Sequence, residues 1–73
     1  MSITKVFKGL SDRYGTFAYM EGDEFILGET VINKTNYLYR GPLEAFRQSR
    51  QFIELAARNR PLVDDIIDYC HNA

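Results

Sequence analysis

The chain has little of what catalytic and metal sites are made from. It contains one cysteine, Cys70, and one histidine, His71, and it has no tryptophan. A single cysteine cannot form an internal disulfide, which favours a reducing compartment such as the cytoplasm. Structural zinc usually needs about four cysteine or histidine ligands, and Asp64, Asp65 and Asp68 fit the positive end of a helix better than a metal cluster. We therefore expect no metal, no cofactor and no enzymatic activity.

Long hydrophobic runs and an excess of one charge are also missing. No apolar stretch reaches the length of about 18 residues that a transmembrane helix needs, so we expect no contact with a membrane. Nine Lys and Arg residues are balanced by ten Asp and Glu residues, for a net charge of −1. This balance excludes a general attraction to nucleic acid or acidic lipid but is compatible with a local basic patch. The first residues lead directly into strand-like sequence, so we expect no signal peptide and a cytoplasmic location.

Aromatic residues, in contrast, are abundant. The 73 residues include five tyrosines and five phenylalanines, and hydrophobic residues make up 45% of the chain. A chain of this length has room for a single domain, residues 1–73, around one core. Such a core supplies at most about 3–5 kcal/mol, and it is too small to hide all of this aromatic surface. Because exposed aromatics are typical of protein interfaces, we expect a monomer that binds another protein.

The sequence changes character at Gly41-Pro42. Before this point, short runs of alternating hydrophobic residues predict strands, and sequential strands joined by short turns favour a meander. The predicted strands cover residues 3–10, 14–20, 24–27 and 37–40. Glu21-Gly22-Asp23 is typical of a tight hairpin, Gly28-Glu29 is expected to end the third strand, and residues 33–36 are expected to form a loop.

Alternation along a strand also predicts which aromatic side chains lie together. Side chains two residues apart point to the same face of a sheet. We therefore expect Phe17 and Tyr19 to share a face of their strand, and Tyr37 and Tyr39 to share a face of theirs. The pattern leaves open which face of the sheet is buried.

After Gly41-Pro42 the sequence is helical. Proline is tolerated at the first helical position because its missing N–H would be unpaired there. An apolar stripe near the helical period predicts one main helix over residues 41–59. Phe46, Phe52 and Ile53 are expected to pack this helix onto the sheet.

A short second helical segment is expected within residues 60–73, opened by Pro61. It is marginal alone, and it either packs on the domain, docks on a partner or forms a partly disordered tail. Because it is short, we expect truncation after Arg60 to leave the rest folded. The predicted fold is therefore α+β, with a small antiparallel β-meander of three to four strands over residues 1–40, followed by a C-terminal helix and this short segment.

The first strand is a candidate binding edge. Lys5 and Lys8 are the kind of charges that protect exposed edge strands from aggregation, and an edge strand can also capture an extended segment of a partner. The preferred contact surface is basic and aromatic, and it consists of Lys5, Phe7, Lys8, Arg13 and Tyr14. In the alternative interpretation Phe7 belongs to the core and the lysines are only solvated. Arg47 and Arg50 on the main helix are the second choice.

Five residues of the N-terminal half match the first strand and the two ribonucleoprotein motifs of a cold-shock domain: Lys5, Phe7, Tyr14, Gly15 and Phe25. In this respect the chain resembles that family. The family's Trp is replaced by Val6, the first Gly and the second Phe of the first motif by Arg13 and Thr16, and the His of the second motif by Leu27, so much of the base-stacking face is lost. The resemblance implies an alternative function, a single-stranded nucleic-acid-binding protein whose phosphate contacts would be Lys5, Lys8, Arg13, Lys34 and Arg40.

A second resemblance covers the whole chain. Its length, its opening residues Met1-Ser2-Ile3-Thr4-Lys5-Val6-Phe7-Lys8-Gly9-Leu10 and its lack of catalytic residues are similar to those of the small RNA-polymerase-binding transcription regulators of Xanthomonas phages. The resemblance implies a host-takeover factor in the host cytoplasm. Such a factor binds a subunit of bacterial RNA polymerase, inhibits initiation at host promoters and promotes antitermination, and an auxiliary contact with nucleic acid is compatible with it.

Overall fold

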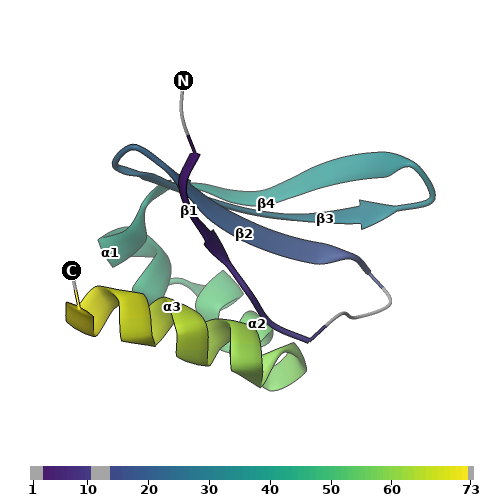
Figure 1. Ribbon diagram of the computed structural model, residues 1–73. Helices are drawn as coiled ribbons and strands as arrows, with labels where there is room; N and C mark the ends of the chain where they lie inside the picture. Colours follow the sequence, from purple (N-terminus) through teal and green to yellow (C-terminus); the bar gives the residue numbers. More distant parts are fainter. Residues whose placement is uncertain (1–2, 11–13, 73) are drawn as a thin grey trace.

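The computed structural model describes residues 3–10 and 14–72. Four antiparallel strands form one sheet in the order β1-β2-β3-β4, and they are β1 (Ile3–Phe7), β2 (Thr16–Glu21), β3 (Glu24–Val31) and β4 (Lys34–Pro42). Three helices follow, which are α1 (Leu43–Arg47), α2 (Arg50–Arg58) and α3 (Arg60–Asn72). All three lie on one side of the sheet (Figure 1). The predicted α+β fold, a meander followed by C-terminal helices, is confirmed. Within the described ranges no helix is long and apolar enough to cross a membrane.

Two tight turns connect the central strands. Gly22 has a φ of 63° in the predicted β2–β3 hairpin, and Ile32 and Asn33 have φ values of 49° and 61° in the β3–β4 turn. In the β3–β4 turn both central residues have positive φ, which is the geometry of a hairpin turn that matches the strand twist. The loop predicted for residues 33–36 is therefore wrong. Only a two-residue turn separates the strands, and β4 begins at Lys34.

The third strand also continues where the sequence predicts a break. β3 runs through Gly28 to Val31, because the ring of Phe17 on β2 lies across this glycine. A Cβ at position 28 would overlap that ring. The glycine is therefore an accommodation of a large neighbouring side chain and does not end the strand.

A bulge in β4 separates two tyrosines that alternation placed together. Leu27 pairs with Tyr39 but Gly28 pairs with Tyr37, so Leu38 is an extra residue in β4. An extra residue shifts the alternation of the strand by one. Tyr39 packs against the core, whereas the ring of Tyr37 contacts Phe17 on the opposite face. The prediction that Tyr37 and Tyr39 share a face is therefore wrong.

The predicted main helix is broken into α1 and α2 at Ser49. The Ser49 hydroxyl donates a hydrogen bond to the carbonyl of Phe46 (2.7 Å) and accepts one from the Phe52 N–H (3.3 Å). Serine caps a helix in this way because its side chain competes with the backbone for hydrogen bonds. Phe46 is fully buried and Phe52 packs against the core as expected, but Ile53 is 69% exposed on α2, contrary to the prediction.

The core fills the space between the sheet and the helices. The sheet contributes Phe7, Ala18, Met20, Phe25 and Leu27, and the helices contribute Phe46, Leu55, Leu62, Val63 and Ile66. The last three belong to α3, which is therefore a packed element. Because α3 closes the core, we now expect the domain to lose its stable fold when residues 61–73 are removed, contrary to the expectation from the sequence.

The junction of α2 and α3 is tied to the segment after β1 by one buried amide. The Asn59 Oδ1 accepts hydrogen bonds from the N–H groups of Leu10 (3.2 Å) and Leu62 (3.3 Å), and its Nδ2 donates to the carbonyl of Leu10 (2.9 Å). The Lys8 N–H donates to Asp65 on α3 (2.8 Å). These bonds fix α3 beside β1 and leave the opposite face of the sheet without helices (Figure 1).

Candidate partner-binding surfaces

The first strand lies at an edge of the sheet, as predicted, because among the described strands it pairs with β2 alone. Phe7 on this strand is 4% exposed. Its ring centroid lies 5.7 Å from that of Phe25 and 5.3 Å from that of Tyr69. Phe7 is thus a core residue, in agreement with the alternative interpretation, and it adds no surface for a partner.

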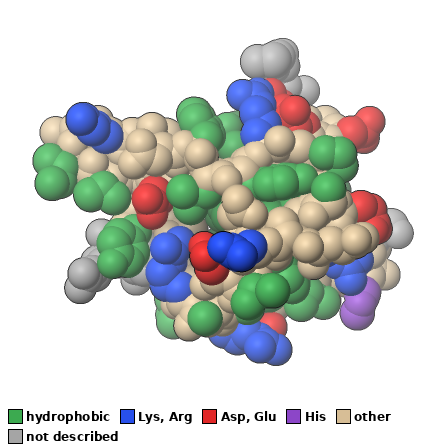
Figure 2. Space-filling model, turned by 180° about the vertical axis from the view of Figure 1, so that it is seen from behind, with side chains coloured by type: hydrophobic (Ala, Val, Ile, Leu, Met, Phe, Trp, Pro, Cys, Tyr) green, Lys and Arg blue, Asp and Glu red, His purple; other side chains and the backbone are tan. Residues whose placement is uncertain are grey.

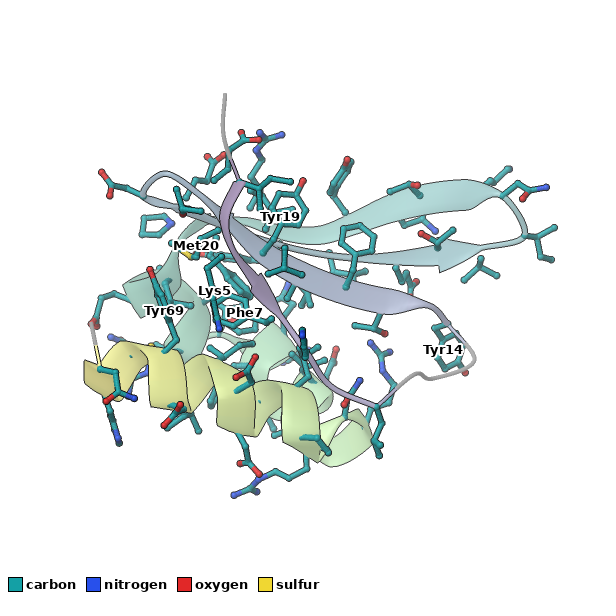
Figure 3. The ribbon with its side chains drawn as sticks, in the orientation of Figure 1. Lys5, Phe7, Tyr14, Tyr19, Met20 and Tyr69 are labelled. Atoms are coloured by element: carbon teal, nitrogen blue, oxygen red, sulfur yellow. The ribbon has the colours of Figure 1, made fainter. Side chains whose placement is uncertain are left out.

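The other residues of the sequence-predicted surface are spread over different parts of the molecule. Lys5 places its Nζ 5.8 Å from the Phe7 ring centroid, on the same side of β1 as the helices. Tyr14 lies near the start of β2, well away from Lys5 (Figure 3), and its ring is 5.3 Å from the Arg58 guanidinium carbon. Lys8 is exposed just after β1. Arg13 lies outside the described residues.

The second-choice residues lie in the helical layer. Arg47 is the last residue of α1 and Arg50 the first of α2, and both are exposed. Arg47 reaches Glu44 at 4.0 Å, a contact between exposed side chains one turn apart. Such pairs contribute little to stability, so both arginines have the character of solvated helix residues.

A different surface, which the sequence did not single out, lies on the side of the sheet that faces away from the helices. We call it the open face, and it consists of Val6, Phe17, Tyr19 and Tyr37 around Ile26, with Arg40 opposite Ile26 on β4. In the strand register Val6 is opposite Tyr19, and Tyr19 is opposite Ile26. Figure 3 shows Tyr19 pointing away from the helices and the next residue, Met20, pointing toward them.

The aromatic rings of the open face contact one another across the strands. Phe17 and Tyr19 are nearly parallel, with centroids 6.1 Å apart and an interplanar angle of 16°. Tyr37 meets Phe17 edge to face at 6.2 Å. Val6 and Tyr37 are 57% and 59% exposed, whereas Ile26 beneath them is fully buried. The open face is therefore an ordered apolar surface with accessible margins.

One end of the open face is acidic. Glu21 and Glu24 lie opposite each other in the register, and Arg40 lies between them. The Arg40 Nε donates a 2.8 Å hydrogen bond to Glu24, and another guanidinium nitrogen is 3.6 Å from Glu21. The hydrogen bond to Glu24 raises the pKa of Arg40, and this arginine is therefore held by carboxylates.

The Tyr19 phenol of this surface stays neutral in the physiological range. Burial raises the pKa of the Tyr19 phenol above its ordinary value of 10.0, and the neighbouring Tyr37 and Glu21 raise it further. A neutral phenol combines an apolar ring with a hydroxyl that can donate or accept a hydrogen bond. This combination is enriched at protein interfaces.

One hollow of the described part of the chain lies in the helical layer. A shallow hollow of about 190 Å³ between α2 and the sheet is lined by Leu27, Leu38, Gln51, Glu54, Leu55 and Arg58. Glu54 and Arg58 are spaced one turn apart, as in a solvated helix surface. Over residues 3–10 and 14–72, no group of three His, Cys, Asp or Glu side chains could hold a metal ion.

Comparison with known proteins gives no relative: no protein-family model, curated protein or solved structure matches this chain. The candidate surfaces therefore rest on the geometry of the molecule. The pairing of Phe17 with Tyr19 was visible in the sequence. Two features could not be predicted from the sequence. One is which face of the sheet the helices cover, and the other is the bulge that brings Tyr37 onto the same side as Phe17.

Proposed function

We propose that the protein is a non-enzymatic regulator that acts by binding another protein. The observation that supports this most directly is the open face, on which Phe17, Tyr19 and Tyr37 lie with Val6 on the side of the sheet away from the helices. Apolar patches rimmed by polar residues are typical of interaction sites on small soluble proteins. Tyrosine and phenylalanine are among the side chains enriched in such interfaces.

The proposed partner is bacterial RNA polymerase. This assignment is supported by the resemblance of the chain, in its length and its opening ten residues, to small polymerase-binding regulators of phages. On this proposal the protein works in the cytoplasm of the host. It inhibits transcription initiation at host promoters and promotes antitermination.

The test is a titration of fluorescently labelled protein with purified RNA polymerase core enzyme, followed by transcription on a template with one promoter and one intrinsic terminator. The proposal predicts a dissociation constant of about 1 μM or lower, less transcript from the promoter and more read-through at the terminator. Absence of binding at 10 μM polymerase, with transcription unchanged, would refute the polymerase as partner.

Single-stranded nucleic acid is the second candidate, because the parallel Phe17 and Tyr19 rings resemble a base-stacking platform. Stacking of a base on an aromatic side chain contributes about 1–3 kcal/mol. The charges favour the protein partner instead. Arg40 is held by Glu21 and Glu24 at the end of this platform, and Lys5 is on the other side of the sheet.

Salt dependence distinguishes the two candidates. If the protein contacted six to ten phosphates of an oligonucleotide such as dT12, binding would release the counterions of those phosphates. The affinity for the oligonucleotide would then fall by about 10³–10⁵ between 50 and 200 mM salt. For a protein partner we expect a much smaller loss over this range. A steep loss of dT12 affinity, together with resonance changes at Phe17 and Tyr19, would favour the nucleic-acid function.

A further inference from the structure

We propose that the open face docks an amphipathic helix of the partner protein, with a lysine or arginine of that helix over the acidic end formed by Glu21, Asp23 and Glu24. This inference rests on the proposed function in one respect, that the partner is a protein. It adds the conformation and the charge of the segment that is recognised.

The dimensions of the open face fit one helix. Four strands at a spacing of about 4.8 Å make a surface about 14 Å wide, and an α-helix with its side chains is about 10–12 Å across. The six residues of β2 extend about 20 Å, which is the length of a helix of about 14 residues. The opposite face of the same sheet is already covered by helices (Figure 1), so the open face is the one left for a helix of the partner.

The side chains of the open face are suited to an apolar helix stripe. Val6 is accessible at the β1 margin and Tyr37 toward the β4 margin, with Phe17 and Tyr19 between them. A large apolar area flanked by tyrosine hydroxyls can bury leucine or isoleucine and still bond the polar rim of a helix. These rings lie on the face of the sheet and not on its edge. A partner can therefore contact them without adding an extended strand to the sheet.

The charges at one end select a basic helix. Glu21, Asp23 and Glu24 line a wide hollow together with Gly41 and Pro42. Arg40 pairs with Glu21 and Glu24, but Asp23 is an exposed turn residue, so three carboxylates meet one guanidinium. A cationic side chain placed in this hollow would gain from complementary charge, and an acidic one would be repelled.

Two other occupants are disfavoured by the same charges. A second copy packed face to face would offer this acidic end Arg40, which already pairs with Glu21 and Glu24. A nucleic acid would bring phosphates toward Glu21 and Glu24. Figure 2 shows acidic and basic side chains interspersed among the hydrophobic ones when the molecule is seen from behind, and the β3–β4 hairpin reaching out beyond the rest. No large basic area is visible from that side.

The experiment uses the full chain labelled with ¹⁵N and two helix-constrained peptides of 14 residues. Both peptides carry the same leucine stripe, and they differ only in lysine or glutamate at the positions that flank it. We expect the lysine peptide to shift the amide resonances of Val6, Phe17, Tyr19 and Tyr37. We expect the glutamate peptide to bind at least about fivefold more weakly, since like charges then meet.

Matched variants place the site. Val6→Lys puts a charge in the open face and should lower the affinity for the lysine peptide at least about tenfold. Ile53→Lys makes the same change at a similarly exposed residue on α2 and should leave the affinity unchanged. Tyr37→Ser is a second variant of the open face. Dispersed amide resonances in each variant show that it is folded.

Three results would overturn the inference. The first is equal binding of the two peptides, or no binding of the lysine peptide at millimolar concentration. The second is a shift pattern centred on α1 and α2. The third is a concentration-dependent shift of the open face in the absence of peptide, which would assign it to a second copy. Failure of the polymerase titration with a normal peptide result would refute only the identity of the partner.

Discussion

Replacement of Phe46 by alanine is the sharpest test of the packing that positions the open face. Phe46 is fully buried, and its ring centroid lies 4.5 Å from Phe25, 5.2 Å from Tyr39 and 5.6 Å from Phe52. It thus joins α1 to β3, β4 and α2 at one point. Removal of a buried phenylalanine costs about 3–5 kcal/mol, including the cavity that is left.

This cost is comparable with the whole stability of the domain. A single core in a chain of this size supplies about 3–5 kcal/mol, so Phe46→Ala should be largely unfolded at 25 °C. Ile53→Ala is the control, because Ile53 is exposed and such surface changes shift stability by about 0.5 kcal/mol. Urea denaturation followed by circular dichroism measures both. A folded Phe46→Ala protein with a melting temperature near that of the wild type would refute the packing described here.

Three further predictions follow from the structure. Truncation after Arg60 should abolish cooperative thermal unfolding, because Leu62 and Ile66 leave the core; a truncated chain with a sharp melting transition would contradict this. Lys5→Glu combined with Lys8→Glu should shift the free energy of unfolding by only about 0.5 kcal/mol and leave the polymerase affinity near that of the wild type, measured by denaturation and by titration, because Lys5 lies on the helix side of the sheet; a clear loss of affinity would place the β1 edge in the interface. Because the pKa of Tyr19 is raised in the folded state, its neutral phenol contributes to stability below pH 10, and this contribution is lost as pH rises through the folded-state pKa. The free energy of unfolding of Tyr19→Phe, measured by urea denaturation, should therefore fall less than that of the wild type between pH 9 and 11.

The meander was predictable because its signals are local. Glycine at position 22 permits the positive φ of the β2–β3 hairpin, and the alternation of Phe17 with Tyr19 follows from the geometry of any strand. The edge position of β1 also follows, since a meander places its first strand at the margin of the sheet.

The errors arose where a distant residue decides the local structure. Gly28 reads as a strand breaker until the Phe17 ring is placed across it. Leu38 gives no local sign that it is an extra residue in β4. Ser49 divides the predicted helix because its hydroxyl donates a hydrogen bond to the Phe46 carbonyl and accepts one from the Phe52 N–H.

The candidate site was harder to predict than the fold for the same reason. Phe7 has the sequence character of either a core or a contact residue, and only the rings of Phe25 and Tyr69 decide between them. The open face depends on the placement of three helices against one side of the sheet and on the bulge that turns Tyr37. Both are tertiary features, which alternation within one strand does not encode.

The central claim is that the open face binds a protein partner, and its most direct test is the affinity of RNA polymerase core enzyme for the Val6→Lys and Ile53→Lys variants. Val6 and Ile53 are both exposed β-branched residues, on opposite layers of the molecule. We predict that Val6→Lys lowers the affinity at least about tenfold, while Ile53→Lys binds like the wild type. Wild-type affinity of a folded Val6→Lys protein, or an equal loss in both variants, would contradict it.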